Sequence, residues 1–145
     1  MKKFEEYLLE GKVQKRTPNP SEAKSLMMQA RDRIADLKSQ SLKESNASFR
    51  FEDGYEAIRE ALQAFLSIRG FKPYSHEAVI AFAIKERLIS QSDIMASDRY
   101  REIRNDINYK GKKVTVNDAK EVIKFADRII PLLESKLITY VKKGI

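Results

Sequence analysis

The sequence predicts an all-α fold, an antiparallel bundle of about five helices. Three observations support this prediction. Apolar residues recur at steps of three and four along several long segments, the spacing that lines one face of an α-helix. No stretch alternates apolar and polar residues for long enough to predict a convincing strand. Proline, glycine and polar clusters separate the periodic segments, and the short connections favour antiparallel neighbours.

Length and composition exclude several classes of protein. A chain of 145 residues is most economically one domain, which buries roughly two-thirds of its unfolded surface. It has no cysteine and a single histidine, His76, which excludes disulfides, thiolate zinc sites and clusters of imidazole ligands. We therefore expect neither a metal nor a cofactor. No stretch approaches the roughly 20 apolar residues of a membrane span, so we expect no membrane association and a cytoplasmic location.

The N-terminal residues 1–19 are expected to lie outside the main helical domain. The sequence of residues 2–10 predicts a short helix. Residues 11–19 read as a linker by composition, because their Thr-Pro-Asn sequence runs into Pro20 and proline biases the residue before it away from helix. The helical bundle domain is expected to span residues 20–145.

Two long helices open this domain. Asn19 as N-cap and Pro20 at the first helical position predict a helix that runs to about Leu42. Its apolar stripe consists of Ala23, Leu26, Met27, Ala30, Ile34 and Leu37. The second helix is predicted over residues 51–69 and ends at Gly70, with a stripe of Phe51, Tyr55, Ile58, Leu62, Phe65 and Leu66.

A third helix is predicted after Ser75, a suitable N-cap residue. Its apolar run over residues 78–84 is unbroken, which indicates a helix surrounded by others or lying partly in a subunit interface. The fourth helix ends at Lys110 and Gly111, a cation followed by a residue that is free to adopt positive φ. Its buried stripe consists of Ala96, Tyr100, Ile103 and Ile107.

The last helix is predicted to start at Thr115. With Asp118 three residues later, Thr115 resembles a capping box. Its stripe consists of Val122, Ala126, Ile129, Leu133, Leu137 and Val141. Pro131 is expected to kink this helix, because its ring removes one hydrogen bond of the helical ladder.

Positive charge concentrates at the end of the fourth predicted helix. The chain carries a net charge of +7, and residues 99–113 hold six basic residues against Glu102 and Asp106. More than half of the excess therefore lies in one short stretch, which indicates an anionic partner. The polar residues Arg101, Arg104, Asn105 and Asn108 adjoin the buried stripe and need not face the core.

Three segments of the chain resemble the HEPN family of small helical-bundle domains. They are residues 55–70, 72–76 and 104–109, and the similarity covers about residues 20–142. The motif of this family is an arginine, usually followed by a polar residue such as asparagine, with a histidine four to six residues further on. Arg104 and Asn105 match the motif, whereas Tyr109 stands where the family has its histidine.

The resemblance implies three kinds of activity. Many members of the family are metal-independent endoribonucleases that dimerise so that two motifs face one cleft. Others pair with a small nucleotidyltransferase as toxin and antitoxin, or bind nucleotide or RNA without cleavage. Histidine suits proton transfer near neutral pH, whereas tyrosine, with a pKa near 10, is a poor base. Arg104 remains suited to holding a phosphodiester.

We therefore predict a homodimeric module that binds RNA, nucleotide or a nucleotidyltransferase partner, with little or no cleavage. The residues expected to bind phosphate are Arg101, Arg104, Asn108, Lys110, Lys112 and Lys113. A first alternative is a metal-independent, toxin-like endoribonuclease with Arg104, Asn105 and Tyr109 as its catalytic residues. A second alternative is a structural helical adaptor.

Helix geometry limits the first alternative. Arg104 and Tyr109 lie about 140° apart around an ideal helix. A joint site therefore needs the helix to unwind near Asn108, or a second subunit to supply a copy of the motif. His76 is interpreted as a structural residue at the start of its helix rather than as a catalyst.

Overall fold

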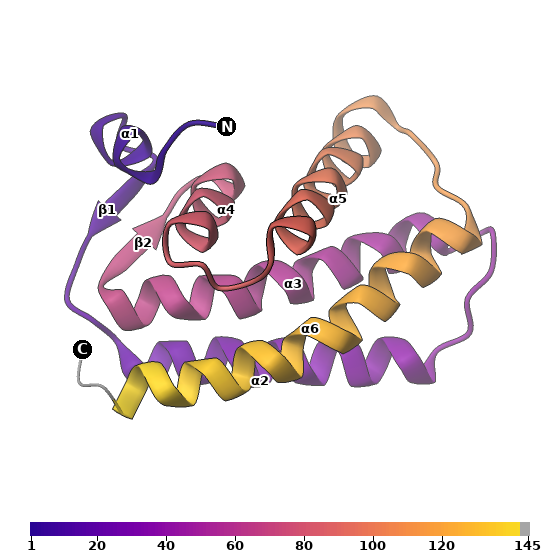
Figure 1. Ribbon diagram of the computed structural model, residues 1–145. Coiled ribbons are helices and arrows are strands. Elements are labelled where there is room, and N and C mark those ends of the chain that lie inside the picture. The colour runs from indigo at the N-terminus through magenta and orange to yellow at the C-terminus, as the bar shows by residue number, and fades with distance from the viewer. Residues whose placement is uncertain (143–145) are drawn as a thin grey trace.

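The computed structural model describes residues 1–142 and shows a bundle of helices with one small two-stranded sheet (Figure 1). The helices are α1 (Phe4–Leu9), α2 (Pro20–Ser39), α3 (Ala47–Arg69), α4 (His76–Lys85), α5 (Gln91–Lys110) and α6 (Val116–Lys142). The strands are β1 (Val13–Lys15) and β2 (Phe71–Pro73). The predicted all-α class is confirmed, with five long or medium helices and a short N-terminal one. Residues 143–145 of the predicted domain lie outside the described part of the chain.

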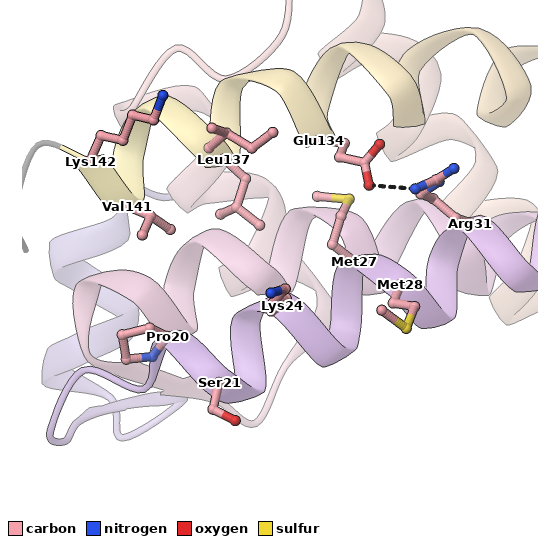
Figure 2. Close-up of a pocket in the computed structure, with 11 residues that line it drawn as sticks. Pro20, Ser21, Lys24, Met27, Met28, Arg31, Glu134, Leu137, Val141 and Lys142 are labelled. Carbon is pink, nitrogen blue, oxygen red and sulfur yellow. Dashed lines mark hydrogen bonds and ion pairs between the residues drawn. The ribbon is translucent and has the colours of Figure 1, made fainter.

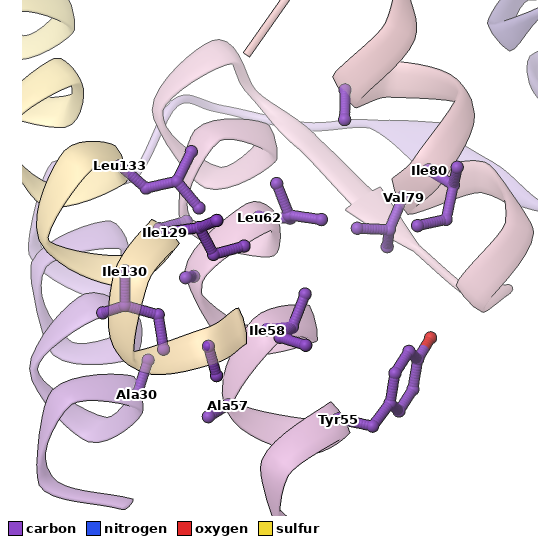
Figure 3. Close-up of a cluster of buried hydrophobic side chains, with 14 of the residues drawn as sticks. Ala30, Tyr55, Ala57, Ile58, Leu62, Val79, Ile80, Ile129, Ile130 and Leu133 are labelled. Carbon is purple, nitrogen blue, oxygen red and sulfur yellow. The ribbon is translucent and has the colours of Figure 1, made fainter. Parts of the chain in front are cut away.

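Helix α3 lies in the middle of the bundle. It packs against α2 and α6 on one side and against α4 and α5 on the other (Figure 1). Apolar side chains from α2, α3, α4 and α6 meet around it (Figure 3). The labelled members of this cluster are Ala30, Tyr55, Ala57, Ile58, Leu62, Val79, Ile80, Ile129, Ile130 and Leu133. Because each is almost fully buried, this cluster supplies much of the hydrophobic stabilisation.

Gly54 permits a close approach of α3 and α6. A Cβ at this position would lie 3.0 Å from Val122 Cγ1 and 3.6 Å from Ile123 Cγ1 of α6. Any larger residue would therefore push against the α6 side chains in a closely packed interior.

The predicted helix ends are confirmed at several positions. Asn19 accepts a hydrogen bond of 3.0 Å from the backbone N–H of the residue three positions later. Thr115 and Asp118 form a reciprocal capping box, with bonds of 3.1 and 3.0 Å between each side chain and the other's backbone N–H. Gly70 and Gly111 end α3 and α5 with φ of +82° and +65°.

Some boundaries differ from the prediction. Helix α2 ends at Ser39 rather than near Leu42, and α3 begins at Ala47 rather than Phe51. Ala47 is fully buried, so tertiary packing extends α3 by one turn beyond its apolar stripe. Helix α6 does not end at Pro131, and the kink expected there stays a prediction.

The expected linker over residues 11–19 is partly wrong. Its residues 13–15 form β1, which pairs antiparallel with β2, the segment that follows α3. Three-residue strands are too short to show the alternation from which a strand is predicted. Beyond β1, the backbone N–H of Arg16 donates to the carbonyl of Gly70 at 2.8 Å, and a Cβ at Gly70 would collide with the Arg16 carbonyl at 2.5 Å.

The N-terminal helix packs into the same core as the rest of the bundle. Phe4 and Tyr7 are buried, and the Phe4 ring meets the rings of Phe71 and Phe82 edge to face, with 5.1 Å between centroids in each pair. Among the helices of residues 1–142, none combines the length and apolarity needed to cross a lipid bilayer.

Candidate functional site

Polar side chains from three helices meet where α3 faces α4 and α5. We call this group the polar cluster. It consists of Tyr55, Glu56 and Arg59 of α3, His76 of α4, and Arg101, Arg104, Asn105 and Asn108 of α5. Its members come from positions 55 to 108, so only the tertiary fold brings them together.

Tyr55 and His76 form the centre of the polar cluster. The Tyr55 hydroxyl lies 3.2 Å from His76 Nδ1, and the two rings stack with 5.8 Å between centroids and 18° between planes. Tyr55 is 1% exposed and lies at the edge of the apolar cluster (Figure 3). Burial raises the pKa of its phenol, against the opposing charges of nearby arginines, so Tyr55 stays protonated.

His76 is held in its neutral form. Burial lowers its pKa below the usual 6.5, and the positive charges of Arg59 and Arg104 lower this pKa further. The N-cap of α4 is Ser75, whose hydroxyl accepts from a backbone N–H at 3.3 Å. Ser75, as expected, caps α4, and within residues 1–142 the Nε2 of His76 has no hydrogen-bond partner.

Two of the three arginines in the polar cluster are bound to carboxylates. Arg59 Nε donates to both oxygens of Glu56 at 3.1 and 3.2 Å. Arg101 is only 8% exposed, and its Nε donates to Asp98 at 2.8 Å. Glu77 and Glu102 lie 3.6 and 3.7 Å from the same guanidinium. The charges of Arg59 and Arg101 are thus balanced within the protein.

Arg104 has a different environment. Within residues 1–142 it forms no ion pair with a carboxylate, and its partners are two neutral amides. Its Nη1 donates to Asn105 Oδ1 at 3.4 Å. In the orientation that satisfies both of its polar atoms, the Asn108 amide accepts from Arg104 Nε at 3.1 Å and donates to Glu52 at 2.8 Å. The guanidinium is therefore oriented by amides and has no direct carboxylate partner among residues 1–142.

The remaining predicted site residues lie further along the chain. Tyr109 is 80% exposed, and α5 is helical through Lys110, so the chain does not unwind to bring Tyr109 beside Arg104. Lys110 is exposed and lies 3.4 Å from Asp106. Lys112 and Lys113 are exposed in the connection between α5 and α6.

The structure changes the roles that we assign to several residues in and around the candidate site. Arg101 was expected to bind phosphate, but it is buried and surrounded by acids, so we assign it a structural role. His76, Tyr55 and Arg59 were not expected in the site. The one signal for them was the resemblance over residues 55–70 and 72–76, because no spacing along the sequence shows that α3 and α4 face α5.

The arrangement is suited to binding an anion. Arg104 offers a permanently charged planar donor group that matches phosphate geometry. The same cluster holds the neutral imidazole of His76, whose pKa the Arg104 charge helps to lower, and an imidazole can accept or donate one proton. Among residues 1–142, no three histidine, cysteine, aspartate or glutamate side chains are grouped as a metal site requires.

A separate groove of 670 Å³ lies between α2 and α6 (Figure 2). Its lining is mostly apolar and includes Met27, Met28, Leu137 and Val141, with an ion pair of 2.9 Å between Arg31 and Glu134 at its side. None of the residues that line it belongs to the polar cluster.

Comparison of the chain with models of protein families, with curated proteins and with solved structures gave no match.

Proposed function

We propose that this protein is a HEPN-like module that binds RNA or nucleotide phosphate through Arg104, with little or no cleavage. One observation carries the proposal. Arg104 is partly buried and oriented by two amides, yet it has no carboxylate partner in residues 1–142, whereas Arg59 and Arg101 do. Burying part of an unpaired cation is costly, so an external anion is its natural partner.

The nearby charges support this proposal. Lys110, Lys112 and Lys113 follow Arg104 along the end of α5 and the next connection, and all three are exposed. They would attract a polyanion without fixing its position, while Arg104 would fix one phosphate. The resemblance to the HEPN family extends the proposal to a homodimer and to a nucleotidyltransferase as a possible protein partner.

Binding of a fluorescently labelled RNA tests the proposal. Affinity is measured by anisotropy over a salt series for the wild type, Arg104→Ala and Arg104→Lys. Arg99→Ala is the matched control, because Arg99 lies on the same helix but pairs with Glu121 at 3.0 Å. Loss of one charged hydrogen-bonding group should weaken binding roughly tenfold or more and lower the salt slope by about one.

The RNA affinities of the three variants distinguish a phosphate site from non-specific binding. A weaker affinity in Arg104→Ala, partial retention in Arg104→Lys and near-wild-type binding in Arg99→Ala would support the phosphate site. An equal loss of RNA affinity in Arg104→Ala and Arg99→Ala would mean that RNA binds through non-specific attraction to positive charge. If the wild type binds neither RNA nor nucleotide, the proposal is wrong, the structural adaptor becomes the best explanation, and the α2–α6 groove is the surface to test.

A second candidate is metal-independent endoribonuclease activity, and the position of His76 favours it. The charge of Arg104 contributes to the lowered pKa of His76, which supports His76 in place of Tyr109 as the candidate base. When Nδ1–H donates to Tyr55, Nε2 is free to take the 2′-hydroxyl proton. The 2′-oxygen would then attack the adjacent phosphorus, a 2′,3′-cyclic phosphate would form as the bond from phosphorus to the 5′-oxygen breaks, and the leaving 5′-oxygen would take a proton from water.

Cleavage in the presence of EDTA tests this candidate. Activity lost in His76→Gln and in Arg104→Ala, but kept in Tyr109→Phe, would establish it. Activity lost in Tyr109→Phe and kept in His76→Gln would instead support the original assignment of Tyr109. If the wild type binds RNA but does not cleave it, the ribonuclease candidate is wrong and the proposal of a non-cleaving binding module stands.

A further inference from the structure

Two large aromatic side chains are exposed near Arg104. Phe49, in the first turn of α3, is 66% exposed, and Tyr109, in the last turn of α5, is 80% exposed. A single exposed apolar residue is ordinary in a folded protein and needs no explanation. These two differ from scattered residues because they flank the same contact.

That contact is made by Asn108. Its amide accepts from Arg104 Nε at 3.1 Å and donates to Glu52 of α3 at 2.8 Å. Tyr109 directly follows Asn108. Phe49 precedes Glu52 by three residues, so the two are neighbours on the surface of α3. The aromatic residues therefore stand on the two helices that this contact joins.

The connection between α5 and α6 adds cations along the chain that runs from Tyr109 to the contact beside Phe49. It is tied to α3 beside Phe49, because the backbone N–H of Val114 donates to Ser48 Oγ at 3.1 Å. Lys112 and Lys113 lie on this connection and are exposed. Cations interleaved with exposed aromatic rings are the combination that proteins use to follow a single strand of nucleic acid, because the cations attract the backbone and the rings stack on bases.

We propose that Phe49 and Tyr109 stack on bases of single-stranded RNA while Arg104 holds a phosphate of the same strand. This inference rests on the proposed function and adds the form of RNA that the site selects. The bases of a duplex are already stacked and paired, so they cannot lie on these rings. An unpaired strand can turn its bases toward the protein while its phosphates follow Arg104 and the lysines.

The first test compares three labelled or competing probes. They are a short single-stranded RNA, the same strand annealed to its complement, and inorganic polyphosphate, which has charge but no bases. Phe49→Ala and Tyr109→Ala should each weaken binding of the single strand by roughly 5- to 150-fold. Both variants should bind duplex and polyphosphate as the wild type does, and Tyr109→Phe should restore single-strand affinity.

Met95→Ala is the matched control. Met95 is also 66% exposed and also lies on α5, but it stands in the second turn of this helix, far along the axis from Arg104. Its removal should leave all three affinities unchanged. Equal losses in Met95→Ala and in Tyr109→Ala would mean that general surface apolarity, not stacking, governs binding.

A second test measures base stacking directly, through the fluorescence of an introduced tryptophan. The chain has no tryptophan, so Phe49→Trp introduces the only indole. Single-stranded RNA should quench its emission, whereas duplex and polyphosphate should leave the emission unchanged. Quenching that is equal for duplex and single strand would contradict stacking.

The results distinguish failure of this inference from failure of the proposed function. If Arg104→Ala weakens binding while Phe49→Ala and Tyr109→Ala do not, the phosphate site stands and the stacking inference is wrong. If no probe binds the wild type, the proposed function itself is wrong. If Phe49→Ala or Tyr109→Ala dissociates a homodimer, as seen by light scattering, and weakens all probes equally, these residues belong to a protein interface and the inference is overturned.

Discussion

The two sides of α3 are built differently. The side that faces α2 and α6 is packed with apolar residues such as Ala57 and, from α6, Ile130, and at Gly54 even a methyl group would crowd α6. On the side that faces α4 and α5, Tyr55 of α3 and Arg101 of α5 are both buried and both have polar partners. The apolar side stabilises the fold through burial. Buried charge also occurs on the α2 side, where Arg33 donates to Glu60 at 2.9 Å, so the α4–α5 side is distinguished by Arg104, which has no carboxylate partner among residues 1–142.

The polar side also shows a contrast within one helix. Arg101 and Arg104 are three residues apart on α5 and have the same chemistry. Arg101 is balanced by acids, whereas Arg104 is bound by amides. A buried, paired arginine supports the fold, and an oriented but unpaired one is available to a ligand. The following predictions, given from the largest expected effect on the free energy of unfolding to the smallest, test this division.

Leu62→Ala tests the apolar cluster around α3. Leu62 is fully buried between α3 and its neighbours, so truncation leaves a cavity and should lower the free energy of unfolding by about 2–5 kcal/mol. Urea denaturation measures the loss. RNA affinity of the folded variant should stay close to that of the wild type. A loss below about 1 kcal/mol would show that the core collapses around the cavity more easily than its packing indicates.

Arg101→Ala tests the structural half of the polar side. Removing a nearly buried arginine leaves Asp98 without its partner, so the free energy of unfolding should fall by about 1–3 kcal/mol. Arg104→Ala is the matched control and should change stability by no more than about 0.5 kcal/mol. Equal destabilisation of the two variants would erase the distinction between a structural and a ligand-binding arginine.

The pH dependence of stability tests the environment of His76. The unfolded chain takes up a proton near the usual histidine pKa of 6.5, whereas the folded protein resists protonation because its pKa is lower. The free energy of unfolding should therefore decrease as pH falls below 6.5 toward the folded pKa. His76→Asn should reduce this dependence, as measured by denaturation at a series of pH values. An identical pH profile in both proteins would contradict the lowered pKa.

Much of the fold could be predicted from the sequence, because apolar periodicity and capping residues are local signals. The stripe of Tyr100, Ile103 and Ile107, the capping box at Thr115 and the stop at Gly111 needed no tertiary information. Strand β1 was not predicted, because it forms by pairing with β2, a segment that follows α3 and is distant in the sequence.

The site was predicted less completely than the fold. The sequence grouped Arg104, Asn105 and Asn108, and the structure brings their side chains into contact, since they lie close together on one helix. His76 was placed in a structural role because its nearness to Arg104 arises only when α4 and α5 pack against α3. Nor could the helical pattern distinguish Arg101 from Arg104, because the acid Glu77 that helps to neutralise Arg101 comes from α4.

The most direct test of the account uses the single histidine as a reporter. In a proton NMR titration, the one histidine in the chain gives one imidazole Cε1–H resonance, with no assignment to resolve. A phosphate bound at Arg104 would offset the positive charge that lowers the His76 pKa, so RNA should shift this resonance and raise the pKa. Arg104→Ala should abolish the response. RNA that binds while the resonance and its pKa stay unchanged would contradict a phosphate site at Arg104.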